Sequence, residues 1–369
     1  MPFADELIGA RTAESLARAI GDVLPGAPLP HLRAAPGQLD GQALRERADL
    51  LRDALLADIP GDYADLVRVV RDARRRTPSF GGWAIWPVTS AIAAKAVSDG
   101  STEAFDDAMD VMAELTGLLT SEFAIRTLLR HDLDRALAAI RTWTTSDDVD
   151  VRRLASEGTR PYLPWSVRVP ELTRRPGATV PILDALYRDP AEYVRRSVAN
   201  HLNDLSRDHA ELVVDTAARW LADSDANTAW VVRHGLRTLV RRGDPGALVL
   251  LGFSAAEASL EIDGPHLDRD SVALGGQIEL RATVRNVGAD DVRLAIDYVV
   301  HHRKANGTQA PKTFKLTTAT VKPGESITLR RTHSFRPITT RRYYPGPHAI
   351  ALQVNGVATD AVAFDLTSE

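Results

Sequence analysis

Residues 151–165 read VRRLASEGTRPYLPW, and the Val-Arg pair that opens this stretch recurs twice further along the chain. Val194-Arg-Arg follows after 43 residues and Val232-Arg after another 38, each behind a turn that carries aspartate. Amphipathic segments that end in Trp143 and Trp220 precede two of the three occurrences. The pattern therefore predicts one pair of helices in each period of about 40 residues.

Such a period is typical of HEAT-like repeats, which stack into a curved solenoid whose second helices line the concave face. Ala43–Leu56 and Phe105–Leu119 also repeat apolar residues at three- and four-residue spacing, which indicates helices earlier in the chain. Ser101 is expected to cap the second of these helices. We therefore predict a helical-repeat domain over residues 1–253.

From about residue 258 the period changes to alternation of apolar and polar residues. Expected strands, separated by glycine-containing turns, cover 259–262, 277–286, 292–300 and 326–335. Six or seven short strands in about 110 residues are typical of an immunoglobulin-like β-sandwich. The expected fold class is thus α plus β in two domains, a HEAT-like α-helical solenoid over 1–253 and a sandwich over 258–369.

Composition excludes several kinds of chemistry. The chain has no cysteine, which excludes disulfides, zinc–thiolate sites, iron–sulfur clusters and a cysteine nucleophile, and which fits a reducing cytoplasm. Neither a signal peptide nor a membrane span is expected. Zinc-protease, nucleophile-elbow and phosphate-loop motifs are missing from the sequence. His301 and His302 are adjacent on an expected strand and so point to opposite faces, which argues against joint metal binding.

Charge is unevenly distributed along the chain. The formal net charge is −4, yet residues 303–342 hold ten basic residues and one acid, Glu325. Phosphate backbones respond to such local fields. A solvated basic face of the sandwich is the simpler interpretation, and the two remain open.

The second helices of the repeats carry a series of arginines that would form a basic stripe on the concave face. These are Arg152, Arg153, Arg195, Arg196, Arg233 and Arg237. Pairing of the same arginines with aspartates between repeats is the alternative, and the two uses are compatible.

Glu157 is the sharpest candidate for chemistry. It is expected at the end of a helix that Gly158 terminates, and Pro161 and Pro164 stiffen the loop that follows. A helix C-terminus disfavours an anion, so a carboxylate stands there against local preference. Arg160, Tyr162 and Trp165 lie within the same nine positions. A solvated carboxylate with aromatic packing behind it is the alternative interpretation.

Other polar residues accompany Glu157. Glu122 follows a polar turn, where capping of the next helix is the simpler use. Asn200, Asn203 and Asp204 lie on the helix after Val194, and the first and last share a face because they are four residues apart. Trp83 and Trp86 are expected to pack.

Several strings resemble the alkylation-repair DNA glycosylases built from HEAT-like repeats, specifically their AlkC-type branch. They are SEGTRPYLPW (156–165), LTSEFAIR (119–126), RRSVANHLND (195–204), RHGLRTLVRRG (233–243), HHRKANG (301–307), PKTFKL (311–316) and HSFRPITTRRYYPG (333–346). The last three suggest the branch that carries an additional immunoglobulin-like domain. The resemblance covers nearly the whole chain.

The resemblance implies a monofunctional glycosylase that removes cationic bases, chiefly 3-methyladenine and 3-methylcytosine, from duplex DNA without flipping the base and without a metal or organic cofactor. Glu157 is implied as the catalytic carboxylate, assisted by Glu122, with Trp165 facing the cationic nucleotide. A monomer in the bacterial cytoplasm, at the nucleoid, is expected. DNA contacts are expected from the arginines of the stripe and from Arg160, Asn200, Asn203, Asp204, Arg303, Lys304, Asn306, Arg341, Arg342 and Tyr343.

Two other functions use the same features. A non-catalytic DNA-damage sensor would share the basic surfaces and lack base release. A protein-binding repeat scaffold would show no salt-dependent affinity for DNA.

Overall fold

The computed structural model describes residues 4–253, 260–338 and 341–368, which divide into two compact units. Unit 1 comprises residues 1–209 and 220–235, and unit 2 comprises residues 210–219 and 236–369. Each unit is described by itself below.

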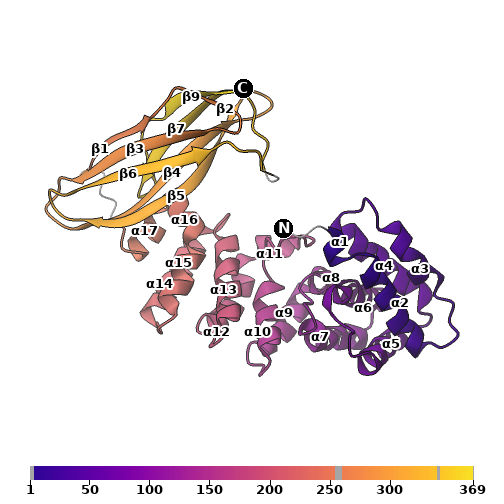
Figure 1. The fold of residues 1–369 in the computed structure, drawn as a ribbon. Coiled ribbons are helices and arrows are strands. Elements are labelled where there is room, and N and C mark those ends of the chain that lie inside the picture. The colour runs from indigo at the N-terminus through magenta and orange to yellow at the C-terminus, as the bar shows by residue number, and fades with distance from the viewer. Residues whose placement is uncertain (1–3, 254–259, 339–340, 369) are drawn as a thin grey trace. The chain divides into compact units, whose positions relative to one another are not determined.

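Helices occupy the described chain up to residue 250 (Figure 1). The first are α1 (Ala4–Leu7), α2 (Ala10–Val23), α3 (Pro30–Ala34), α4 (Leu44–Asp58), α5 (Tyr63–Arg76), α6 (Ile85–Asp99), α7 (Thr102–Thr116) and α8 (Ile125–His131). The repeats follow as α9 (Leu133–Trp143), α10 (Val149–Glu157), α11 (Pro170–Arg174), α12 (Val180–Leu186), α13 (Glu192–Leu205), α14 (Ala210–Ala222), α15 (Thr228–Gly235), α16 (Arg237–Arg242) and α17 (Pro245–Leu250). Short 3₁₀ helices cover Ala35–Gln38, Gly82–Ala84 and Pro176–Thr179.

The predicted repeat is confirmed in unit 1. The three Val-Arg positions lie on α10, α13 and α15, which pack side by side in that order (Figure 1). Close packing depends on Gly235 of α15, because a Cβ there would lie 2.8 Å from the Cδ2 of Leu202 on α13. Ser101 caps α7 as expected, accepting a hydrogen bond from the Ala104 amide at 3.2 Å.

Unit 2 contains two β-sheets. Its strands are β1 (Leu260–Leu267), β2 (Ser271–Ala273), β3 (Gln277–Asn286), β4 (Val292–Arg303), β5 (Gln309–Val321), β6 (Ser326–Ser334), β7 (Gly346–Val354), β8 (Val357–Ala358) and β9 (Val362–Thr367). One sheet has the order β1-β3-β6, and the other β2-β9-β7-β4-β5 with β8 beside β7. Ile278 and Leu280 of β3 share a core with Val300 of β4 and Ile350 of β7, so the sheets pack face to face as a sandwich.

Helices α16 and α17 belong to unit 2 with the strands. Leu248 and Phe253 pack against Ala295 of β4, and the Gln353 side-chain amide donates to the Arg241 carbonyl at 2.7 Å. The predicted linker after residue 253 lies outside the described residues, and the domain boundary there stays a prediction.

Three histidines are buried in the unit 2 core around Phe335. The rings of His302, His333 and His348 lie 6.2, 4.9 and 5.8 Å from that ring, centroid to centroid. Burial, reinforced by Arg341, lowers the pKa of His302 to about 3 and that of His333 to about 4. Both imidazoles are therefore neutral in the folded protein at neutral pH.

We expect these histidines to make unit 2 sensitive to acid. Their folded pKa values lie below the unfolded value, so between about pH 6.5 and pH 4 only the unfolded chain takes up their protons, and stability is lost as the pH falls. The free energy of unfolding should drop by about 2–4 kcal/mol between pH 7 and pH 5. Calorimetric unfolding of the wild type and of a His302→Phe/His333→Phe variant measures this, and an equal acid loss in both proteins would contradict the assignment.

Candidate active site

A row of buried, alternating acidic and basic side chains lies in unit 1. Its members are Glu122, Arg153, Glu157, Arg160 and Asp204, and we call it the charge ladder. Arg153 pairs with Glu122 and lies 3.6 Å from Glu157. Arg160 donates to Glu157 at 2.6 Å and to Asp204 at 2.9 Å. With three carboxylates and two guanidinium groups, the ladder is formally −1.

Local sequence places Glu157 in this row. It is the last residue of α10, as predicted, and only 6% of it is exposed. At Gly158 a Cβ would lie 2.9 Å from Ile125 Cγ2 of α8 and 3.0 Å from the Leu154 carbonyl oxygen. Glycine is therefore needed for the close approach of α10 to α8 directly beside the carboxylate.

The two glutamates of the ladder differ in acidity. Burial raises the pKa of Glu157, but Arg160, Arg153 and the Ser197 hydroxyl together hold it below its usual value. Burial raises the pKa of Glu122, and Arg153 only partly offsets this. Neighbouring carboxyl groups with pKa values moved apart are typical of paired acid and base roles.

The carboxylate of Glu122 accepts from the Thr120 hydroxyl at 3.0 Å and from Arg153, and those partners replace the simpler helix-capping use. Helix α8 begins three residues later, at Ile125.

A neutral hydrogen-bond network supports Glu157 from α13. The Ser197 hydroxyl donates to Glu157 Oε2 at 2.7 Å and lies 3.0 Å from the Ser156 hydroxyl. His201 Nδ1 lies 2.9 Å from the Ser156 carbonyl, and its Nε2 lies 3.1 Å from the Thr179 hydroxyl. Burial lowers the pKa of His201 to about 4, so the network adds no charge to the ladder at neutral pH.

Arg126 fixes the loop that follows Glu157. This fully buried guanidinium donates to the carbonyls of Gly158, Arg160 and Val167 at 3.1, 2.8 and 2.6 Å. Both ends of the proline-containing loop are thereby tied to α8.

Two exposed aromatic side chains stand on segments that also carry ladder residues, Trp165 on the loop after Glu157 and Tyr193 on α13. Trp165 is 47% exposed, adopts a left-handed φ of 59° and lies 6.4 Å from the Trp83 ring. Tyr193 is 48% exposed, and the Arg153 guanidinium lies 5.2 Å from the centroid of its ring. Trp86 is buried and stacks on Phe123, so it packs as predicted.

The predicted basic stripe is only partly an open surface. Arg152 pairs with the Asp189 carboxylate at 2.7 Å, and Arg195 is 9% exposed and donates to the Asp189 and Pro190 carbonyls. Arg152 therefore joins two successive repeats, and Arg195 binds the turn before its own helix, which corrects the expectation that they face outward. Arg196 and Arg233 are exposed.

The remaining predicted residues of the repeats have varied surroundings. Asn200 lies 3.1 Å from His234 Nε2 on α15, Asn203 is buried, and Arg237 is half-buried at the start of α16.

In unit 2 the two predicted basic segments meet. Arg341 donates to His302 Nε2 at 2.8 Å, and Gln309 Nε2 donates to the Pro347 carbonyl at 3.0 Å. Arg303 crosses Gly346, where a Cβ would lie 1.8 Å from its Nη1. Lys304 and Arg342 are exposed beside these contacts.

Two predicted DNA contacts of unit 2 have structural uses. The Asn306 side chain accepts from the amide and hydroxyl of Thr308 and so forms the turn between β4 and β5. The Tyr343 ring packs 5.4 Å from Phe335, against the core. Thr340, in the second basic string, lies outside the described residues.

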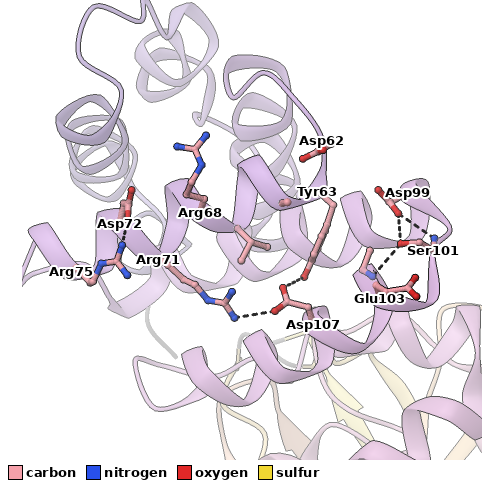
Figure 2. A pocket seen from close by; sticks show the side chains of 13 residues that line it. Asp62, Tyr63, Arg68, Arg71, Asp72, Arg75, Asp99, Ser101, Glu103 and Asp107 are labelled. Carbon is pink, nitrogen blue, oxygen red and sulfur yellow. Dashed lines mark hydrogen bonds and ion pairs between the residues drawn. The ribbon is translucent and has the colours of Figure 1, made fainter.

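A polar recess of about 560 Å³ opens elsewhere in unit 1, between α5 and α7 (Figure 2). Its charged groups bind one another: Tyr63 donates to Asp107 at 2.8 Å, Arg71 to the same carboxylate at 3.2 Å, and Arg75 to Asp72 (Figure 2). The contacts to Asp107 join α5 to α7, whereas the Arg75–Asp72 pair lies within α5. The recess contains no predicted site residue.

Within the described ranges, no three histidine or acidic side chains are grouped so as to hold a metal ion. No helix of these ranges combines the length and apolar character needed to cross a bilayer.

Comparison with known proteins identifies the family. The solved structure of Pseudomonas fluorescens alkylpurine DNA glycosylase AlkC bound to DNA containing an abasic site analog is 34% identical, covers 99% of both chains and superposes with a TM-score of 0.86. This chain belongs to the AlkC family. Uncharacterized protein YhaZ of Bacillus subtilis (strain 168) is 31% identical over 323 residues, which is 88% of this chain and 87% of that protein. A family model described as the C-terminal Ig-like domain of uncharacterised protein YhaZ matches residues 261–368.

The AlkC relationship confirms the predicted fold class, with an immunoglobulin-like domain after the helical repeats. Sequence reasoning missed Arg126, Ser197 and Tyr193. Arg126 had a detectable signal, since it stands among Ile125, Leu128 and Leu129 on the apolar side of its helix.

We expect Arg126→Leu to release the loop beside Glu157. Three carbonyl groups would lose their donor, which should lower the free energy of unfolding by about 3 kcal/mol or more. Arg130→Leu, on the exposed side of the same helix, is the matched control. Denaturant unfolding with limited proteolysis measures the effect, and equal stability of the two variants would show that Arg126 does not hold the loop.

Proposed function

We propose that this chain is a monofunctional DNA glycosylase that hydrolyses the N-glycosyl bond of cationic, N-alkylated bases in duplex DNA, with 3-methyladenine and 3-methylcytosine as substrates. The proposal is supported chiefly by the charge ladder, which carries one carboxylate more than its guanidinium groups neutralise. A site with surplus negative charge favours a ligand that is positive before or during reaction.

The chemistry of the substrate matches such a site. Methylation at a ring nitrogen makes the base a cation, and its C1′–N bond breaks with both electrons passing to the base, which leaves neutral. The sugar becomes oxocarbenium-like, and its positive charge is stabilised by an adjacent carboxylate. The oxygen of a water molecule then bonds to C1′ and leaves an abasic site.

Glu157 is assigned the central role because its carboxylate is ionised and held from two sides. It stabilises the sugar cation, orients the water and accepts its proton. Glu122, whose pKa is raised, assists through Arg153. Trp165 offers an aromatic face to the cationic nucleotide.

DNA contacts are proposed at basic groups of both units. In unit 1 they include the exposed Arg196 and Arg233. In unit 2 they are the exposed Lys304 and Arg342 and the half-buried Arg303 and Arg341. The related AlkC structure is a complex with DNA that contains an abasic site analog, which supports DNA as the partner. Base release without flipping of the nucleotide is part of the proposal and is based on the sequence resemblance to AlkC-type enzymes.

We expect Glu157→Gln to abolish base release while DNA affinity is retained. The substitution keeps the shape and removes the charge that stabilises the sugar cation, so single-turnover release should slow by about 10²–10³-fold or more. Release of free bases from methylated DNA is measured by chromatography, with Glu171→Gln, a half-exposed carboxylate paired with Arg174, as the control.

Release at the wild-type rate by Glu157→Gln would show that another group is catalytic. A wild type that binds DNA tightly and releases no base would instead be a damage sensor, and one without salt-dependent affinity for DNA would fit a protein scaffold.

We expect the basic segments of unit 2 to contact phosphates. In an Arg303→Gln/Lys304→Gln/Arg342→Gln variant, the slope of log K against log salt should become shallower by about 0.9 for each lost contact. Arg269→Gln/Arg281→Gln removes arginines that pair with Asp268 and Glu279 on the same domain and serves as the control. Equal slopes in both variants would mean that these segments are bystanders.

A further inference from the structure

An arginine pair packed on Tyr162 is a feature that the catalytic proposal does not use. The guanidinium carbons of Arg168 and Arg207 lie 4.5 and 4.4 Å from the centroid of this ring. Both arginines are exposed, whereas the ring is half-buried. One aromatic side chain therefore contacts two solvent-facing guanidinium groups.

The surrounding structure keeps this pair in place. Tyr162 donates to the Asp208 carboxylate, and Arg168 donates to the Pro161 carbonyl at 3.1 Å. The segment that carries Tyr162 is tied at both ends by Arg126. Tyr162 and Arg168 are thus held in place before a ligand binds, so binding requires little reorganisation of these side chains.

Several arginines lie close to one another here. Burial lowers the pKa of Arg126 to about 10, and the nearby Arg168, Arg160 and Arg45 add to this effect. The Nη2 atom of Arg126 is buried without a hydrogen-bond partner. The charged groups that act on Tyr162 are Arg168, Arg207 and the Asp208 carboxylate, which accepts the hydrogen bond of the Tyr162 hydroxyl.

We propose that Arg168 and Arg207, held on Tyr162, form a binding site for a backbone phosphate of the DNA beside the reacting nucleotide. The inference rests on the proposed function, which supplies the DNA. Guanidinium groups match the geometry of phosphate oxygens. The site adjoins the charge ladder, because Tyr162 follows Arg160 by two residues and Asp208 follows Asp204 by four. A phosphate bound there would position the neighbouring deoxyribose beside the Glu157 carboxylate.

The chain offers a matched control. Arg188 lies 4.9 Å from the centroid of the Tyr187 ring, which reproduces the cation–ring contact, but it pairs with Asp223 at 2.9 Å. Arg188→Gln therefore removes a ring-bound arginine whose charge is already neutralised.

The test measures affinity for a duplex that contains an abasic-site analogue, over a series of sodium chloride concentrations. For Arg168→Gln/Arg207→Gln we expect the slope of log K against log salt to become shallower by about 0.9, the change for one lost phosphate contact, with affinity falling about tenfold or more. Tyr162→Leu should weaken binding with a smaller change of slope, because it keeps both charges. Arg188→Gln should behave as the wild type.

An unchanged slope in the Arg168→Gln/Arg207→Gln variant, or an equal loss in Arg188→Gln, would overturn the phosphate site. Base release by the wild type is assayed separately. If the wild type releases no base while the double variant loses its salt slope, the proposed catalytic function fails and the phosphate site stands.

Discussion

The charge ladder from Glu122 to Asp204 is the interaction on which the site depends. Buried ion pairs of this kind stabilise a fold little, because desolvation offsets much of their attraction. Their value is positional: every charged group faces a partner from another segment, so α10, α13 and the loop after Glu157 have one favourable arrangement. The ladder has one carboxylate more than it has guanidinium groups. In the proposed function, this surplus negative charge stabilises a positively charged substrate or transition state.

The groups of α13 that support Glu157 are uncharged, so they do not neutralise the surplus negative charge of the ladder. Ser197 and the uncharged His201 support α10 from α13 without adding a cation. Arg126 holds the loop through carbonyl groups and not through the ladder carboxylates. The carboxylate of Glu157 thus remains ionised although it is nearly buried. The immunoglobulin-like domain brings its two basic segments together through a different contact, between Arg341 and His302.

Sequence alone predicted the elements whose signals are local. The Val-Arg repeat located α10, α13 and α15, alternation predicted β3 with its observed bounds, and Gly158 marked the end of α10. Partners distant in the chain were not predictable in this way. Arg152 has the same local pattern as Arg153, yet it pairs with Asp189, because the choice depends on which acid the next repeat presents. The sequence around Ser197 does not indicate its role, because that role depends on a hydrogen bond to Glu157, which is distant in the chain.

The central claim is that Glu157 is an anion at the pH at which the protein works. Infrared difference spectroscopy between the wild type and Glu157→Gln, recorded across a pH titration, observes this carboxyl group directly. The account predicts that the difference spectrum contains only an ionised carboxylate at neutral pH, with protonation below the usual glutamic-acid range. A protonated carboxyl band of Glu157 that persists at neutral pH would contradict it.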